Sequence, residues 1–311
     1  MPDDPGEQHV IDILLAARPD PRRHPHAPRV DAGDDAALLA DGTLVTADTL
    51  VEGIHWDDRS SPDDVGWKAV AVNASDIGAM GGRPSWATLA MCLPRPLDTA
   101  WVDAFSRGLQ AACAHFGVVL VGGDTTRSPG PRVVSITMGG TVVRPVLRSG
   151  GRAGDQLFVT GTPGQAAAGF LSGGPALGAL TRPMPPVAMG AEIGENGLAS
   201  AMLDISDGIG RDLSRLARAS GVGAVVDPTA LPLSPQLRAL ARPLDAQVAF
   251  GDDYELLMSV PAEQVASVQA LAQRHDRRLT RIGHLTVEPE VRLLGCPWPA
   301  ALFSHFDRTQ P

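Results

Sequence analysis

Six short segments of the 311-residue chain place aspartate next to glycine or another small residue. Small neighbours let a phosphate group or a metal ion approach the backbone closely, whereas carboxylates alone would repel a phosphate. The combination therefore indicates divalent cations between carboxylates and phosphate. Mg²⁺ is the expected ion, because the ligands are hard oxygens and no cluster of Cys or His accompanies them. The segments are residues 33–35, 46–49, 73–76, 122–126, 204–208 and 251–255.

Each segment also has a purely structural interpretation. Two aspartates after a glycine usually form a turn, and Asp207 precedes an amphipathic stretch that it could cap. Asp76 is harder to explain in this way, because it falls late in a predicted helix, where the negative end of the helix dipole disfavours a carboxylate. Asn73 lies three residues earlier on the same face. Since all six segments would have to be structural at once, we prefer a ligand-binding site.

The composition excludes several classes of protein. The net charge is −9, with 27 Asp, 8 Glu, 25 Arg and a single lysine, Lys68. The pI near 5.3 does not fit the basic surface that a nucleic-acid scaffold needs, so no nucleic-acid partner is expected. At 44% hydrophobic residues the chain can form proper cores, which excludes global disorder. No apolar run reaches the ~20 residues of a membrane span, so no membrane partner is expected.

The N-terminus and the cysteines indicate a cytoplasmic protein. The first residues have neither the basic region nor the apolar core of a signal peptide. Cys92, Cys113 and Cys296 are far apart and odd in number, which is typical of a reducing compartment.

In the first half of the chain, strands and helices must position the aspartate segments. Ser61 as N-cap, followed by Pro62, predicts a helix that runs to about Met80 and ends at two glycines. Alternation and β-branched residues predict strands. The predicted strands are 43–46, 118–121 and 132–143, and the predicted helices are 61–80 and 98–115.

After the glycine-rich stretch at 148–154 the pattern changes to short strands that alternate with helices. We place the domain boundary near residue 147, which gives an N-terminal domain of residues 1–147 and a C-terminal α/β domain of residues 148–311. The predicted strands are 156–160, 201–205, 224–227 and 254–260, and the helices are 165–171, 207–220 and 261–275.

No P-loop is present, and Lys68 does not lie in a glycine-rich loop. The turn at 161–164 is either a phosphate cradle or a plain strand–helix connection, since it lacks the required lysine and hydroxyl residue. No Cys or Ser nucleophile with a His partner is indicated. The proline-rich segment 18–29 is predicted to be an exposed loop.

In their order along the chain, the six segments resemble those of the thiamine-monophosphate kinases, a family of the aminoimidazole ribonucleotide synthetase-like superfamily. One segment alone is weak evidence, but six in this order are specific. The similarity extends from residue 6 to residues 303–306, so it covers almost the whole chain. The stretches that carry it are residues 33–39, 47–55, 68–81, 122–126, 204–208 and 251–256.

The resemblance implies an α/β (α+β) fold of two domains. The mixed sheet-and-helix N-terminal domain would bind ATP with several Mg²⁺ ions and form a homodimer, and a C-terminal α/β domain would follow. The reaction would transfer the terminal phosphoryl group of ATP to thiamine monophosphate, which gives thiamine diphosphate. The implied Mg²⁺ ligands are Asp35, Thr46, Ala47, Asp48, Asp76, Asp124, Asp204 and Asp207. The implied ATP contacts are Gly123, Asp124, Arg148 and Ser206, and the implied substrate contacts are His55, Asp252 and Phe303.

The chemistry of this reaction agrees with the residue types. The acceptor is a phosphate oxygen that is already ionised at pH 7, so no general base and no covalent nucleophile are needed. Two anions must instead be aligned and their charge neutralised. Aspartate-bound Mg²⁺ performs that task, and Arg148 is a plausible additional clamp.

Two departures and three rival families keep alternatives open. Asp252 stands where relatives often carry Glu, and Ala47 where Thr is common. A selenophosphate synthetase would show a reactive Cys beside Lys near its N-terminus, and the hydrogenase-maturation dehydratase would end in a Cys-containing tail; this sequence shows neither feature. Aminoimidazole ribonucleotide synthetase fits segments 33–35 and 253–256 less well. A catalytically silent metal- and nucleotide-binding protein would bind the ligands without turnover.

Overall fold

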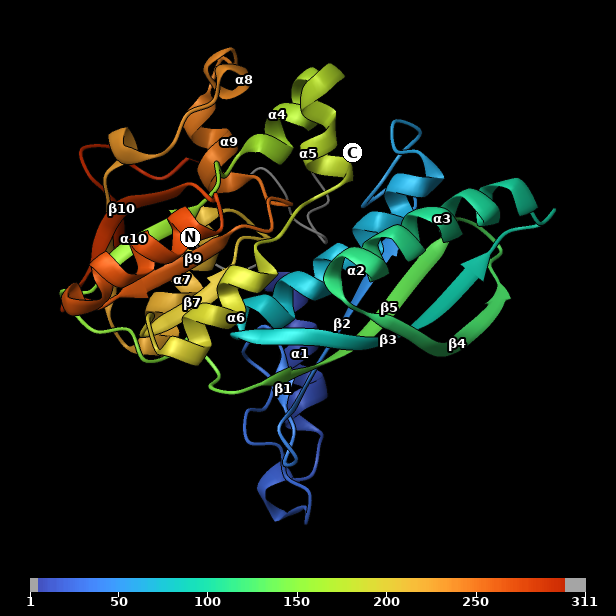
Figure 1. The fold of residues 1–311 in the computed structure, drawn as a ribbon, viewed down its shortest axis with the longest axis horizontal. Coiled ribbons are helices and arrows are strands. Elements are labelled where there is room, and N and C mark those ends of the chain that lie inside the picture. The colour runs from blue at the N-terminus through green and yellow to red at the C-terminus, as the bar shows by residue number, and fades with distance from the viewer. Residues whose placement is uncertain (1–4, 300–311) are drawn as a thin grey trace.

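The N-terminal half of the chain builds the first of two β-sheets (Figure 1). The computed structural model describes residues 5–299. The strand order is β1-β2-β5-β3-β4, in which β3 and β4 are parallel and the other neighbours antiparallel. The elements are α1 (Pro5–Ala16), β1 (Ala37–Leu38), β2 (Thr43–Val51), α2 (Pro62–Ala79), β3 (Gly82–Leu93), α3 (Thr99–Phe116), β4 (Val119–Arg127) and β5 (Val133–Val142).

Helix α2 begins and ends where the local sequence predicts. The Ser61 side chain accepts a hydrogen bond from the backbone N–H of Asp64 at 3.2 Å, which caps the first turn. Met80 closes the helix, and Gly81 follows with a φ of 74°, a conformation that glycine adopts without strain. The predicted helix at 61–80 is therefore confirmed. Most of its side chains are buried, so its polar residues need partners inside the protein.

Helices α2 and α3 cross with their backbones in direct contact. A Cβ atom on Gly108 of α3 would lie 1.7 Å from the carbonyl oxygen of Asp63, and one on Gly66 of α2 would lie 2.2 Å from that of Phe105. Neither position can therefore hold a side chain without moving a helix. The core that joins both helices to one face of the sheet includes Val70, Ile77, Phe105, Leu109 and Ile136.

The opposite face of the first sheet is largely uncovered. Along β2 the burial alternates, so that Leu44 and Leu50 face the helices while Ala47 and Thr49 are exposed. Most of β4 is exposed, and Val121 keeps 61% of its surface accessible. Within the described residues, no helix packs over this face.

The second sheet comes from the C-terminal half and has helices on both faces. Its order is β11-β8-β10-β6-β9-β7, in which only β11 and β8, among the described strands, are parallel. The strands are β6 (Gln156–Thr160), β7 (Ala201–Asp204), β8 (Gly223–Val226), β9 (Leu256–Val260), β10 (Leu279–Thr286) and β11 (Val291–Leu293). The helices are α4 (Gln165–Ser172), α5 (Leu177–Thr181), α6 (Val187–Asn196), α7 (Ile209–Ser220), α8 (Pro235–Arg238), α9 (Pro243–Ala249) and α10 (Val265–Arg274).

Alternating side chains of β6 show how both faces are buried. Leu157 and Val159 belong to a core that includes Leu213 of α7. Phe158, between them, belongs to a second core with Ile193 of α6. Because successive side chains of a strand point to opposite faces, one apolar strand serves both cores.

Helix α6 of the second half of the molecule packs against α2 of the first half. A Cβ on Gly190 of α6 would lie 2.3 Å from the carbonyl oxygen of Gly78 on α2. A Cβ on Gly194 would lie 3.0 Å from the Cα of Gly81. The two halves thus meet backbone to backbone, and Figure 1 shows α6 beside α2 at the centre of the molecule.

Most predicted elements are present with boundaries shifted by a few residues, but the first sheet differs in two respects. The strand predicted at 118–121 continues to Arg127, so Gly123 and Asp124 lie inside β4 and not after it. The interior strand β3 was not predicted, because Pro84 and irregular polarity conceal it. The first sheet ends at Val142 and the second begins at Gln156, and a domain boundary near residue 147 stays a prediction.

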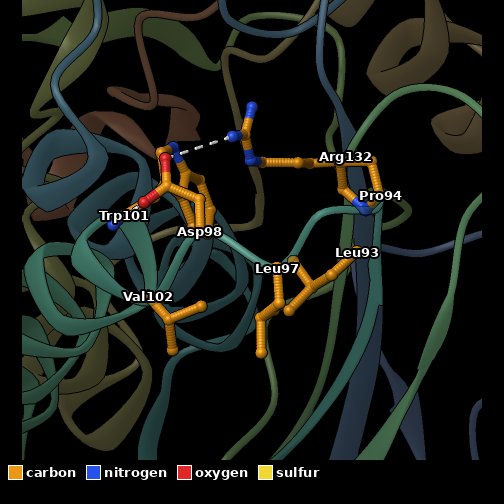
Figure 2. A pocket seen from close by; sticks show the side chains of 7 residues that line it. All are labelled: Leu93, Pro94, Leu97, Asp98, Trp101, Val102 and Arg132. Atoms are coloured by element: carbon orange, nitrogen blue, oxygen red, sulfur yellow. Dashed lines mark hydrogen bonds and ion pairs between the residues drawn. The ribbon is translucent and has the colours of Figure 1, made fainter.

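A small hollow lies where α3 begins, beside the end of β3 (Figure 2). The Arg132 guanidinium lies 4.9 Å from the centre of the Trp101 ring. It also forms ion pairs with Glu52 at 2.5 Å and with Asp98 at 3.8 Å. Since these charged groups already pair with one another, we assign no ligand to the hollow.

Candidate active site

Three carboxylates from distant parts of the chain meet beside α2. Asp35 belongs to the turn before β1, Asp76 to the last turn of α2, and Asp204 to the end of β7 in the second sheet. One carboxylate oxygen from each lies within 4.8 Å of the others. The fold therefore brings together three of the predicted Mg²⁺ ligands, at the junction of the two halves.

Hydroxyl groups orient two of these carboxylates. Thr46 Oγ1 donates a hydrogen bond to Asp76 Oδ2 at 2.6 Å, and Ser75 Oγ donates to Asp204 Oδ2 at 2.5 Å. Thr46 was predicted as a direct ligand, and this contact places it next to the three carboxylates. Ser75 lies inside one of the aspartate segments, but no role was predicted for it.

Arg148 holds the third carboxylate from the connection between the two sheets. Its Nη2 donates to Asp35 Oδ1 at 2.7 Å, and its backbone N–H donates to Asp34 Oδ1 at 2.6 Å. Burial opposes the charge of this guanidinium, but the neighbouring Asp35 raises the pKa of Arg148 overall. The predicted ATP contact is thus also a neighbour of the predicted metal ligands.

The electrostatics of the cluster favour a bound cation. Burial raises the pKa of Asp76 well above its ordinary value, and the charges of Asp48 and Asp204 raise it further. Burial, followed by the Asp35 charge, does the same for the pKa of Asp204. Asp35 Oδ2 is buried and has no hydrogen-bond partner among the described residues. Crowded carboxylates with an unused acceptor oxygen are a suitable donor set for a hard divalent cation.

Asp48 lies within β2, one strand position beyond the exposed Ala47. Its backbone N–H donates to Asn73 Oδ1 at 3.1 Å, while Asn73 Nδ2 donates to the Ala69 carbonyl at 3.0 Å. Asn73 therefore fixes β2 against α2. Burial, together with the charges of Asp252 and Asp207, raises the pKa of Asp48 to about 6. Ala47 presents its side chain to the opposite face, so only its backbone could take part.

Asp207 does not cap α7, which was one interpretation of its position. The N-cap of that helix is Gly208, with a φ of 93°. The Asp207 carboxylate instead pairs with Arg215, and its backbone N–H donates to Asp212 Oδ2 at 3.0 Å. Burial and the Asp207 charge raise the pKa of Asp212 to about 7. Ser206, a predicted ATP contact, lies in the same loop and accepts a hydrogen bond at its carbonyl.

Two of the predicted substrate contacts, His55 and Asp252, lie in loops near Asp48 and Lys68. His55 Nδ1 accepts a hydrogen bond from the Val51 N–H at 3.0 Å. The Asp252 carboxylate is close enough to Asp48 to affect its charge, and it pairs with Lys68 at 2.9 Å. Phe303 lies outside the described residues.

Gly123 and Asp124 are not brought to the cluster within one chain. The strand registers place Asp48 opposite Ile136, Leu89 opposite Ile136, and Gly123 opposite Leu89. Three strand spacings separate Asp48 from Gly123, which corresponds to about 14 Å. The strand order therefore separates these two residues from Asp48 of the same chain, and they are not part of the three-carboxylate cluster.

The turn at 161–164 is a plain connection and not a phosphate cradle. The Asp253 carboxylate accepts hydrogen bonds from the backbone N–H groups of Gly164 at 2.6 Å and Ala166 at 3.1 Å. These are the N–H groups at the start of α4 that a phosphate would need. Burial raises the pKa of Asp253 to about 8.

Comparisons with known proteins give matches over most of the chain. Residues 33–142 match the model of the AIR synthase related protein N-terminal domain, and residues 152–295 match that of its C-terminal domain. The chain is 37% identical over 284 residues to the thiamine-monophosphate kinase of Salmonella typhimurium, which covers 83% of this chain and 84% of the relative.

Two solved structures are similar over nearly their full length. The thiamine-monophosphate kinase of Stenotrophomonas maltophilia aligns with a TM-score of 0.77 at 36% identity, over 92% of this chain and 96% of that chain. AaThiL in complex with AMPPCP and TMP aligns with a TM-score of 0.79 at 29% identity, over 95% of this chain and 94% of that chain.

Proposed function

The chain belongs to the thiamine-monophosphate kinase family of the AIR synthase related proteins, and from this membership we propose how its residues carry out the reaction. The chain uses ATP to phosphorylate thiamine monophosphate, which makes thiamine diphosphate. ATP is therefore a co-substrate. We propose that Mg²⁺ ions accompany it and that transfer between the two phosphate groups is direct.

The observation that carries the proposal is the cluster of Asp35, Asp76 and Asp204, with its unpartnered Oδ2 atom on Asp35. These residues would hold Mg²⁺, with Asp48 and Asp207 as further ligands next to them. When bound, the ions would neutralise phosphate charge and allow two anions to approach each other.

The chain's own groups have positioning roles. The Arg148 guanidinium, already at the cluster, adds a permanent positive charge that can bind a phosphoryl oxygen. Thr46 and Ser75 hold two carboxylates in fixed orientations. The acceptor oxygen is ionised at neutral pH, so no residue needs to remove a proton from it.

The direct test is turnover. Purified protein with ATP, Mg²⁺ and thiamine monophosphate is expected to form thiamine diphosphate and ADP in equal amounts, as measured by chromatography. Binding of both substrates without product would instead support a catalytically silent protein. Consumption of another phosphate acceptor, with no diphosphate formed, would contradict the assigned substrate.

A second prediction concerns the metal and does not depend on turnover. ATP is expected to raise the melting temperature of the protein in the presence of Mg²⁺, and clearly less after chelation, because only the native state binds the metal-bound nucleotide. The measurement is a thermal shift with a non-hydrolysable ATP analogue. Equal shifts with and without Mg²⁺ would count against metal-bridged phosphates.

We propose that the protein acts as a homodimer through the uncovered face of the first sheet. Val119 and Val121 of β4 are apolar and more than half exposed, and neighbouring exposed apolar side chains on an uncovered sheet face favour an interaction surface. A second copy on this face would also explain the predicted roles of Gly123 and Asp124, because the partner chain could bring them to a cluster from which the strand order separates them in their own chain.

Mixing two inactive variants tests this arrangement. Asp204→Asn and Asp124→Asn each remove a carboxylate, but a mixed dimer would contain one site with neither substitution. After subunit exchange, equal amounts are expected to recover about a quarter of wild-type activity. No recovery, although light scattering shows mixed dimers, would place Asp124 in the site of its own chain or outside both sites.

Cytoplasmic localisation is part of the same proposal. Cys92, Cys113 and Cys296 are all free thiols, as expected in a reducing compartment. Among the helices of residues 5–299, none has both the length and the apolar character needed to cross a membrane.

A further inference from the structure

The single lysine of the chain is buried at the substrate end of the site. Lys68 lies in α2, and 3% of its side chain is exposed. A buried ammonium group is costly unless it is paired. Lys68 Nζ donates to Asp252 Oδ2 at 2.9 Å and to the His55 carbonyl oxygen at 3.3 Å. One cation therefore contacts both predicted substrate-binding residues that the structure describes.

The second oxygen of the Asp252 carboxylate is also held. Tyr254, the only tyrosine of the chain, donates its hydroxyl to Asp252 Oδ1 at 2.9 Å. Each carboxylate oxygen thus has a protein donor, one from each half of the molecule. This arrangement fixes the direction of the carboxylate more tightly than one contact would.

The backbone of this loop is strained and firmly docked. Asp252 and Tyr254 have φ values of 66° and 51°, a left-handed conformation that non-glycine residues rarely adopt. Their N–H groups donate to the carbonyls of Ser206 and Ile205, both at 2.9 Å. A Cβ on Gly251 would lie 1.9 Å from the Ser206 carbonyl oxygen, so the two loops touch. Such strain persists where the surrounding contacts fix the loop, and it is common at ligand sites.

The Lys68–Asp252 pair connects the two halves of the molecule, but it differs from other connections. Arg182 also joins the halves, through an ion pair with Asp63 at 2.5 Å, and 37% of its side chain is exposed. That pair lies at the start of α2 and contacts no predicted site residue. It can therefore distinguish simple docking of the halves from an effect on the site.

We propose that Lys68 is a positioning residue of the acceptor site. It holds Asp252 and the His55 loop in one arrangement across the two halves, and Tyr254 completes the support, so that both residues are ready to bind thiamine monophosphate. The inference rests on the proposed function. Lys68 has no hydrogen bond to Asp35, Asp76 or Asp204, so its loss weakens binding of the acceptor and leaves that of ATP unchanged.

The test compares Lys68→Met and Tyr254→Phe with the wild-type protein. Lys68→Met is expected to raise the KM for thiamine monophosphate at least about tenfold, with the KM for ATP unchanged. Tyr254→Phe, which removes one hydrogen bond, is expected to raise it about threefold. Calorimetry without ATP should show the same changes in the Kd of thiamine monophosphate. If Lys68→Met fails to fold, Tyr254→Phe carries the test, because it leaves no buried charge unpaired.

Arg182→Met is the matched control, since it breaks a pair between the same two halves away from the site. It is expected to leave both KM values unchanged. If Lys68→Met and Arg182→Met have the same effect, or if the KM values for both substrates rise together in Lys68→Met, Lys68 only docks the two halves and the proposal is overturned.

A double-mutant cycle measures the coupling between Lys68 and Asp252 separately from the effect of each residue alone. Once Asp252→Asn has been introduced, Lys68→Met is expected to cost much less than it does alone, because its partner has already lost its charge. Independent effects would overturn the proposal. Absence of thiamine diphosphate in the wild-type assay would refute the proposed function, whereas normal wild-type turnover with unchanged KM values in both variants would refute only the role of Lys68.

Discussion

Asp76→Asn is expected to lower kcat at least about a hundredfold while the protein stays folded. The substitution keeps the shape of the side chain and one oxygen, but it removes a charge from the cluster with Asp35 and Asp204. The measurement is steady-state turnover at saturating ATP, Mg²⁺ and thiamine monophosphate. Asp103→Asn on α3 is the control, because it makes the same chemical change at an exposed position.

The same substitution is expected to maintain or increase stability in the absence of metal. Burial and neighbouring charges raise the folded-state pKa of Asp76 above its ordinary 3.8. The contribution of protonated Asp76 to the free energy of unfolding is therefore fully present below pH 3.8. It is lost as the pH rises through the folded-state pKa. At pH 8, Asn avoids this loss, so the free energy of unfolding of Asp76→Asn should equal or exceed that of the wild-type protein.

For the kinetic prediction, near-normal turnover of Asp76→Asn would exclude Asp76 from the metal site.

Gly108→Ala is expected to lower the free energy of unfolding by about 3 kcal/mol or more. In a helix this change normally stabilises a protein by up to about 1 kcal/mol. Here the sign reverses, because the new Cβ would lie 1.7 Å from the Asp63 carbonyl oxygen, and backbone atoms cannot rotate away. Urea unfolding monitored by circular dichroism would measure the difference.

Gly178→Ala provides the comparison for this prediction. Gly178 also lies in a helix, but a Cβ there would have no atom within 4 Å. It is expected to be neutral or slightly stabilising. Gly108→Ala should also reduce turnover, because α2 carries Asp76 and Ser75, and a shifted helix misplaces both. Equal stability of the two variants would show that α2 and α3 can separate without cost.

Local signals in the sequence were sufficient to predict the helix that carries much of the site. Ser61, Pro62 and the two glycines after Met80 define α2 by short-range effects on the backbone. The unfavourable place of Asp76 in that helix then indicated a ligand, and the cluster with Asp35 and Asp204 fits that prediction. Such arguments succeed where a residue is unfavourable in its own helix or strand and no neighbour in the sequence stabilises it.

What could not be predicted depends on contacts between distant residues. Lys68 and Asp252 are 184 positions apart, and no local pattern links them. The distance of Asp124 from the cluster follows from the order β2-β5-β3-β4, which a single sequence does not specify. Asp207 was suitable as a helix cap by its position, but its carboxylate instead forms an ion pair with Arg215 in the second turn of α7.

The contact between α6 and α2 also bears on how this protein can evolve. Gly78 and Gly190 touch through their backbones, so almost any mutation there would add atoms where no space exists. Selection would then remove such mutations, although neither glycine is a predicted site residue. For this geometric reason, we expect few neutral substitutions at these two positions. In a library of random variants, we expect substitutions at Gly78 and Gly190 to be depleted among active clones, as substitutions of the site aspartates are.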